Sequence, residues 1–267
     1  MKKTLLVCSR STRKYFPNID HCRIISKPLN ELDVKKLQDS ETNVIAVGGG
    51  AVIDAAKIIS SEPIICYPTT AAGTCYTSHS VYWKGSNKLS VKVPVPKQVI
   101  VKEEYLTTLP ESVIQKTTYD AVSHCLDSMW STKKTDLSNE MASEALNLLL
   151  NYDKTSTLIT AGNLAGRAIA LCPTTILHSL SYPLTGMYGV DHGVALGFLL
   201  ETVCDVMNSD VAQDMNIPKI DITTFSINDV STEALKYSKL QDTDKRFDLQ
   251  DIKKIYTDSL RRNSHKR

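Results

Sequence analysis

The feature that most constrains the fold of this chain is a run of three glycines, Gly48, Gly49 and Gly50. The run separates an apolar, β-branched stretch, 43–47, from a stretch with helical spacing, 51–60. Similar strand-like runs occur at residues 4–8, 22–26 and 63–67, and a shorter helical pattern at 30–38. Because strands that alternate with helices form βαβ units, the first part of the chain is predicted to contain a parallel sheet.

The second part of the chain is dominated by helical patterns. Helices are expected at residues 112–130, 137–150, 161–170, 175–182 and 192–207. Residues 91–101 are β-rich, and Pro94 and Pro96 favour an edge or irregular strand there. The polar tail 259–267 is expected to fray. We therefore predict an α/β nucleotide-binding domain over residues 1–105 and an all-helical domain over residues 106–267, with a cleft between them.

Composition narrows the class of protein. Of the 267 residues, 42% are hydrophobic and 22% are charged, as in a globular protein with a substantial core. The formal net charge of +2 does not indicate a nucleic-acid partner, and no apolar run approaches the roughly 20 residues that span a bilayer. Arg10 interrupts the apolar start of the chain, which favours a buried strand over a signal peptide. Seven scattered cysteines without a CxxC pair indicate reduced thiols and a cytoplasmic location.

A strand, a glycine turn and a helix in succession suit phosphate binding. Glycines let the backbone approach a phosphate, and the first turn of the helix offers free N–H groups. The segment lacks the GxGxxG spacing, so a tight turn without a ligand is the alternative. A second loop, 67–74, follows the next strand and is rich in hydroxyl and small residues, which suit a ribose or a nicotinamide or simply close packing. Since ligands gather at the carboxyl ends of parallel strands, the two loops together favour a nucleotide site.

Four residues of the second part form a candidate metal site. Asp120 and His124 lie four apart in a helical run, so their side chains share one helix face. His178 and His192 lie fourteen apart, on either side of residues 183–189. One carboxylate and three imidazoles suit a divalent first-row metal with a coordination position left open. The alternative is that each histidine is an ordinary surface or core residue, because spacing alone does not reveal long-range proximity.

Four segments, in the same order along the chain, resemble the motifs of the iron-containing alcohol dehydrogenase family. GGGAVIDAAK resembles GGGSxxDxAK, PTTAAGTCYTS resembles PTTAGTGSE, YDAVSHCLD resembles DAxxHxxE, and HSLSYPLTGMYGVDHG resembles HxxAHPLGxxYxxPHG. The resemblance implies a Rossmann-like α/β domain followed by an all-α domain, the dehydroquinate synthase-like architecture. It also implies an oxidoreductase with Fe²⁺ or Zn²⁺ and a nicotinamide cofactor. The implied metal ligands are Asp120, His124, His178 and His192, and the implied cofactor contacts are Gly48, Gly49, Gly50, Asp54, Thr69, Thr70 and Thr74.

The chain departs from the family pattern in three respects. It is considerably shorter than usual members, and its PTTAAGTCYTS loop lacks the GSE end. Tyr182 stands where the family commonly has a second histidine assigned to proton relay, and it is therefore our candidate catalytic residue. The segments HSLSYPLT and SHCLDSMWS resemble the subgroup that reduces phosphonoacetaldehyde to 2-hydroxyethylphosphonate.

The subgroup resemblance predicts the reduction of a short anionic aldehyde. The metal is expected to act as a Lewis acid on the aldehyde oxygen while the reduced nicotinamide delivers hydride. Arg167 and Lys88 are the candidate cations for the anionic group of the substrate, with a solvated surface charge as the alternative for each. Ser9 and Arg10 follow the first strand where the family often has an aspartate, which favours NADPH over NADH unless they form only a basic surface turn.

Three other functions remain open from the sequence. A polyol or glycerol-type dehydrogenase and a dehydroquinate synthase-like cyclase use the same scaffold, and the shortness of the chain suggests a non-catalytic nucleotide-binding relative. A cyclase needs more basic residues around the metal than the sequence offers. Retention of all four ligand positions argues against a non-catalytic relative. The expected partner is a small aldehyde or alcohol, and a homodimer is one assembly that the sequence allows.

Overall fold

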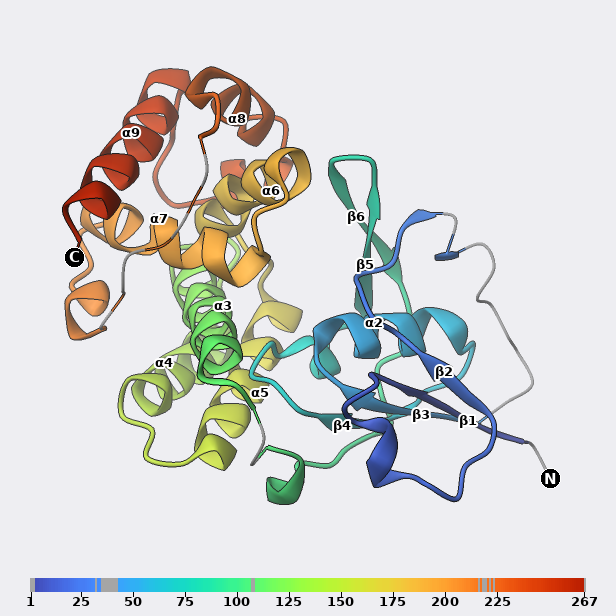
Figure 1. Cartoon of the computed structure of the whole chain (residues 1–267). Helices are drawn as coiled ribbons and strands as arrows, with labels where there is room; N and C mark the ends of the chain where they lie inside the picture. The colour runs from blue at the N-terminus through green and yellow to red at the C-terminus, as the bar shows by residue number, and fades with distance from the viewer. Residues whose placement is uncertain are drawn as a thin grey trace.

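The computed structural model describes residues 3–31, 33–34, 43–106, 109–215, 217, 220, 222 and 224–266. The described chain has a sheet-containing part and a helical part that lie side by side (Figure 1). The sheet elements end at Val99 and the first long helix begins at Glu111. The division into a domain over residues 1–105 and another over residues 106–267 remains our proposal.

A five-stranded parallel sheet forms the first part. Its strand order is β2-β1-β3-β4-β7, and its strands are β1 (Thr4–Cys8), β2 (Cys22–Ile24), β3 (Asn43–Gly48), β4 (Ile65–Pro68) and β7 (Gln98–Val99). The register pairs Cys8 with Val47 and Gly48 with Pro68, so the three central strands end at one edge of the sheet. Helix α2 (Gly50–Ile59) packs against β3 and buries nearly all of its residues. The predicted α/β class is confirmed. The helix predicted at 30–38 lies largely outside the described residues.

A two-stranded hairpin lies between β4 and β7 in the chain and was not predicted. It consists of β5 (His79–Lys84) and β6 (Asn87–Lys92), which turn at Gly85 with a left-handed φ of 58°. Residues 91–101, where an edge or irregular strand was predicted, contain the end of β6 and the short edge strand β7, separated by residues 93–97. Because the two prolines cannot donate to a ladder, β6 ends before Pro94, and the short β7 begins only after Pro96. The hairpin stands beside α2 and reaches the helical part (Figure 1).

The second part is helical, as predicted. Its long helices are α3 (Glu111–Met129), α4 (Asp136–Leu150), α5 (Thr155–Leu171), α6 (Ile176–Tyr188), α7 (His192–Val206), α8 (Ile227–Ala234) and α9 (Leu249–His265). The prediction that the tail frays from residue 259 is wrong, since α9 continues to His265 and buries Ser259 against Thr202. None of the described helices is long and apolar enough to cross a bilayer.

Helix α6 runs further than predicted. It passes through Pro183 and stops at Tyr188, where Gly189 adopts the left-handed conformation that closes many helices. The extra turns carry Gly186, which lies so close to the hairpin that a Cβ there would overlap the carbonyl oxygen of Ser86. Glycine at this position therefore lets the hairpin tip dock directly on α6, the helix that carries His178.

Close helix contacts at other glycines fix the loop after β4. A Cβ on Gly162 would overlap the carbonyl of Ala71, and a Cβ on Gly166 would overlap the carbonyl of Gly73. Helix α5 therefore presents a bare backbone face to this loop, which makes its turn at Gly73 with φ 68°. The loop that carries the predicted cofactor-contacting threonines is thus held between the sheet and the helical part.

Candidate metal and nucleotide site

The structure brings the four predicted metal ligands together around one oxygen atom. Asp120 Oδ1 lies 3.4 Å from His124 Nε2, 3.3 Å from His178 Nε2 and 3.8 Å from His192 Nε2. Helix α3 supplies Asp120 and His124 one turn apart, α6 supplies His178, and His192 begins α7. Close approach of α3 and α7 is possible because Gly193 and Gly197 have no side chains to hold them apart.

The polar atoms of this cluster lack the partners that buried atoms normally have. Asp120 Oδ1, His178 Nε2 and His124 Nδ1 are buried and make no hydrogen bond with the described residues. Buried polar atoms are rarely left unsatisfied, so a converging set of them indicates a missing ligand. Donor atoms of Asp120, His178 and His192 all lie within 4.8 Å of one another. This donor set fits a divalent metal.

His124 belongs to the cluster through ring contacts as well as through Asp120. Its ring stacks on that of His178 with the centroids 4.7 Å apart and the planes 10° apart. The compact three-atom group consists of Asp120, His178 and His192, with His124 beside it. The assignment of His124 as the fourth metal ligand remains a prediction.

A fifth residue of the site, Asp127, was missed by the sequence analysis. It is fully buried on α3, and its Oδ2 lies 2.8 Å from His178 Nδ1. Its carboxylate also accepts hydrogen bonds from the backbone N–H groups of Leu177 and His178 and from the Thr175 hydroxyl. A carboxylate that accepts the second ring N–H of a histidine fixes the ring and its tautomer. Asp127 thereby aims His178 Nε2 at the cluster.

The electrostatics of the cluster favour the ligand forms of its groups. Burial alone would raise the pKa of Asp120, but the three histidines hold it well below its usual range. Burial lowers the pKa of His124 to about 4, and burial with the charge of Lys88 lowers that of His192. An ionised carboxylate beside neutral imidazoles is the state that binds a metal. His178 differs: burial alone would lower its pKa, but the neighbouring carboxylates of Asp120 and Asp127 outweigh burial and raise it.

Lys88, a predicted substrate-binding residue, and Tyr182, the predicted catalytic residue, both lie at the cluster. Lys88, on β6, places Nζ 3.4 Å from His192 Nε2 and 4.6 Å from the centroid of the Tyr182 ring. Tyr182 is buried on α6, with its ring 5.7 Å from that of His192 and stacked on it. Burial raises the pKa of Tyr182 above its ordinary value, so the phenol is a weak proton donor here. Its catalytic role remains a prediction.

The other predicted substrate residue, Arg167, lies elsewhere. It is exposed on α5, and its guanidinium carbon stands 5.8 Å from the Tyr76 ring. No contact among the described residues joins it to the cluster of histidines. Of the two cations proposed from the sequence, only Lys88 touches the candidate metal site.

The glycine turn and the threonine loop adjoin each other at the carboxyl edge of the sheet. Thr69 donates its backbone N–H to the carbonyl of Gly48, and a Cβ on Gly49 would lie 3.1 Å from Thr70. Gly49 is the N-cap of α2 and provides no side-chain hydrogen bond to the first turn of the helix. A Cβ on Gly50 would face Thr74, and the buried hydroxyl oxygen of Thr74 has no hydrogen-bond partner among the described residues. Free helix N–H groups beside an unpartnered hydroxyl suit a phosphate or a ribose.

The remaining predicted cofactor residues flank this edge. Ser9 follows β1, and its hydroxyl lies 2.9 Å from that of Thr12, which donates to the carbonyl of Val47. Arg10 is exposed and next to Ser9. Asp54 lies one turn into α2 and is buried against β5, and burial raises its pKa to about 6. These assignments remain predictions.

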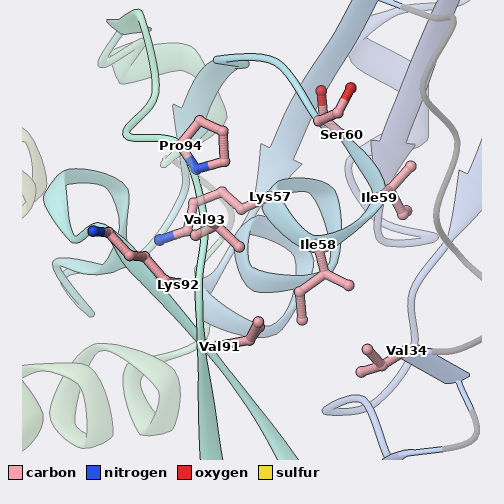
Figure 2. A pocket seen from close by; sticks show the side chains of 10 residues that line it. Val34, Lys57, Ile58, Ile59, Ser60, Val91, Lys92, Val93 and Pro94 are labelled. Atoms are coloured by element: carbon pink, nitrogen blue, oxygen red, sulfur yellow. The ribbon is translucent and has the colours of Figure 1, made fainter.

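A cavity of about 300 Å³ lies at the end of α2 away from the glycine turn (Figure 2). Apolar side chains from α2 and from the segment after β6 line most of it. The Lys57 ammonium is occupied by four oxygens of the loop 74–79 at 2.8–3.1 Å. The Lys57 amine is therefore held by the protein and is not free to bind a ligand in this cavity.

Comparison with known proteins assigns the chain to a family. Residues 20–110 match the family described as iron-containing alcohol dehydrogenase, and residues 114–218 match the Fe-containing alcohol dehydrogenase family, C-terminal. The two matches contain the glycine turn, the threonine loop and all four predicted metal ligands. The chain belongs to the iron-containing alcohol dehydrogenase family.

The individual relatives share only a modest fraction of identical residues with this chain. The 1-propanol dehydrogenase of Salmonella typhimurium is 25% identical over 186 residues, 60% of this chain and 50% of that protein. The phosphonoacetaldehyde reductase of Streptomyces viridochromogenes is 28% identical over 200 residues, 58% of this chain and 51% of that protein. The chain thus spans about half the length of these curated relatives. A solved sulfoacetaldehyde reductase of Bifidobacterium kashiwanohense, in complex with NAD⁺, shares the fold: the TM-score is 0.80 at 18% identity over 96% of this chain and 90% of that one.

Proposed function

We propose that this chain is a metal-dependent, nicotinamide-linked reductase of a short aldehyde that bears an anionic group, phosphonoacetaldehyde being the best-fitting example. The observation that carries the proposal is the convergence of Asp120 Oδ1, His178 Nε2 and His192 Nε2, two of them buried without hydrogen-bond partners. Family membership and the names of the relatives support it.

The metal ligands are proposed to be Asp120, His124, His178 and His192. When bound, Fe²⁺ or Zn²⁺ supplies Lewis acidity for a carbonyl oxygen. The protein itself orients the ligands: Asp127 holds His178, and the docking of α3 on α7 holds His192 beside Asp120. Placement of the ring nitrogens before the ligand arrives lowers the cost of binding.

The nicotinamide cofactor is proposed to bind across the carboxyl edge of the sheet. Gly48, Gly49 and Gly50 would receive its phosphates at the start of α2, with the hydroxyls of Thr69, Thr70 and Thr74 beside them. The reduced cofactor supplies hydride. Ser9 and Arg10 are proposed to favour NADPH, because neither repels a 2′-phosphate.

The substrate is proposed to be anionic because Lys88 lies directly beside His192. A positive charge next to the proposed metal ligands attracts an anionic aldehyde. It does not by itself exclude a neutral aldehyde. The relative that acts on phosphonoacetaldehyde supports an anionic substrate, whereas the relative named for 1-propanol supports a neutral one. The position of Lys88 beside His192 supports the anionic alternative.

The test is turnover by purified, metal-loaded protein with NADPH and NADH on matched aldehydes. The expected result is a kcat/KM for phosphonoacetaldehyde well above that for propanal or glyceraldehyde. Higher kcat/KM for the neutral aldehydes would replace the proposal with a propanol or polyol-type dehydrogenase. Nicotinamide binding without turnover of any aldehyde would instead support a non-catalytic nucleotide-binding relative.

A further inference from the structure

Two cysteines that the proposed chemistry does not use lie in contact in the parallel sheet. The Sγ atom of Cys8 is 3.4 Å from the Sγ atom of Cys22. Cys8 ends β1 and Cys22 begins β2, and the two strands pair directly (Figure 1). The register sets Cys22 opposite Leu6, so Cys8 lies two residues further along β1 on the same face of the sheet. The two thiols therefore meet diagonally across neighbouring strands.

The two thiols differ in their access to solvent. Cys8 is buried and Cys22 is partly exposed, while the other five cysteines of the chain are buried. Burial, together with the neighbouring Cys22 thiol, raises the pKa of Cys8 to about 12, so this thiol stays protonated. Since oxidants react with accessible thiolates, an oxidant in solution reaches Cys22 first. Cys8 then lies at contact distance behind the modified sulfur.

The position of Cys22 at the edge of the sheet allows the two sulfurs to approach further. A disulfide bond is about 2.05 Å long, so the sulfurs must come closer by roughly 1.4 Å. Strand β2 has three residues and pairs with a strand on one side only. Cys8 lies between β2 and β3, and its carbonyl accepts the Ile25 N–H at 2.8 Å. Movement of the short edge strand toward Cys8 therefore supplies the approach.

A bond between these sulfurs would close the loop 9–21 at both of its ends. This loop carries Ser9 and Arg10, the proposed contacts to the cofactor ribose. The Thr12 hydroxyl of the same loop donates to the carbonyl of Val47 at 2.7 Å, directly before the glycine turn. A covalent link at the base of the loop reduces its freedom to adapt to a bound nucleotide. Oxidation of the two thiols is therefore coupled to the carboxyl edge of the sheet.

We propose that Cys8 and Cys22 form a reversible disulfide site, that a peroxide oxidises it, and that the bond weakens binding of the nicotinamide cofactor. The effect on the cofactor rests on the proposed function, but the disulfide site does not. The Cys22 thiolate attacks a peroxide oxygen, the O–O bond breaks, and a sulfenic acid and hydroxide form. The Cys8 sulfur then attacks the Cys22 sulfur: the S–S bond forms, the S–O bond breaks, and the oxygen leaves as water with the Cys8 proton. The two thiols lose two electrons in all, hydrogen peroxide is reduced to two waters, and a thiol reductant reverses the bond.

Peptide mapping of zinc-loaded protein after mild treatment with hydrogen peroxide tests the site; zinc is used because Fe²⁺ consumes peroxide. Trypsin releases the two cysteines in separate peptides, 4–10 and 15–23, each with a single cysteine. The expected product is a linked pair of these peptides, about 2 Da lighter than their sum, which dithiothreitol separates. The other five cysteines should remain free to react with an alkylating agent after denaturation, which is the internal control. Non-reducing electrophoresis should show a single-chain mass.

Titration with NADPH tests the coupling. Peroxide should raise the NADPH dissociation constant of the wild type severalfold, and dithiothreitol should restore it. Cys22→Ser, a change of one atom at a partly exposed position, should bind NADPH as the reduced wild type does, before and after peroxide.

Absence of the linked peptides, or a link between two chains, would overturn the disulfide site. Unchanged NADPH affinity of the oxidised wild type, or an equal loss in Cys22→Ser, would overturn the coupling. Linked peptides in a protein that binds no nicotinamide even when reduced would support the disulfide site and contradict the proposed reductase function.

Discussion

Asp127 Oδ2 lies 2.8 Å from His178 Nδ1, and the same carboxylate accepts the backbone N–H groups at the start of α6. One side chain on α3 therefore fixes both the ring orientation of a proposed metal ligand and the position of the helix that carries it. The arrangement makes Asp127 a positioning residue, although it contributes no atom to the cluster itself.

Asp127→Asn preserves the shape of this side chain but replaces one carboxylate oxygen with an NH₂ group. Because the amide accepts fewer hydrogen bonds, the ring of His178 is held less firmly. The metal dissociation constant should rise by roughly 10- to 100-fold, as is usual when an orienting partner is lost. Competition with a chromogenic chelator measures this constant. Asp153→Asn, at an exposed position, is the control. Equal metal affinity in the two variants would show that Asp127 does not position His178 for metal binding.

Local sequence was sufficient to predict the parts of the fold whose signals are local. The strands at Thr4–Cys8 and Asn43–Gly48 are short apolar runs bounded by turn-forming residues. Helices α3 and α7 show continuous helical spacing of their apolar residues. The proximity of the four proposed ligands was also expected, because their two segments resemble motifs of the family.

What the sequence did not predict depends on contacts between distant segments. Asp127 is an ordinary helical acid until His178, 51 residues away, is placed against it. The hairpin partner β5 has a mixed pattern of polar and aromatic residues because it packs on α2 and β6 rather than inside the sheet. The long reach of α9 follows from burial of Ser259, which its polar sequence conceals.

The contact of α5 with the loop after β4 predicts a selective effect of an added methyl group. Gly166→Ala places a Cβ against the carbonyl of Gly73, so backbone must shift, at a typical cost of about 1–3 kcal/mol. The melting temperature should fall by several degrees, and nucleotide affinity should fall with it because the threonines move. Gly50→Ala is the stability control, since its Cβ would meet nothing closer than 3.5 Å. Identical melting temperatures for the two variants would contradict this packing.

Asp54 predicts a pH dependence of stability. Burial raises its pKa from 3.8 to about 6, against the opposing charges of Lys57 and Lys88. The folded state therefore retains a proton that the unfolded state has lost, and this carboxyl lowers the free energy of unfolding as the pH rises from about 4 to 6, by up to about 3 kcal/mol. Asp54→Asn removes the effect. Its melting temperature, measured on metal-free protein, should exceed that of the wild type more at pH 7.5 than at pH 5. A difference independent of pH would show that the carboxyl is not shifted.

The loop after β1 predicts the choice of nicotinamide. Ser9 leaves room for a 2′-phosphate and Arg10 can pair with it, so kcat/KM should be roughly ten- to a hundredfold higher with NADPH than with NADH. Ser9→Asp adds a negative charge beside the ribose and should reverse the preference. Steady-state kinetics with both cofactors measure it. Equal or better use of NADH by the wild type would show that this loop does not select the cofactor.

The central claim is that Asp120, His124, His178 and His192 hold one divalent metal. Metal content by inductively coupled plasma mass spectrometry, on wild type and His192→Ala prepared in parallel, tests it most directly. We expect about one equivalent of iron or zinc per chain in the wild type and almost none in His192→Ala, with nucleotide binding retained because the glycine turn is untouched. A His192→Ala protein that keeps stoichiometric metal and full turnover would contradict the account.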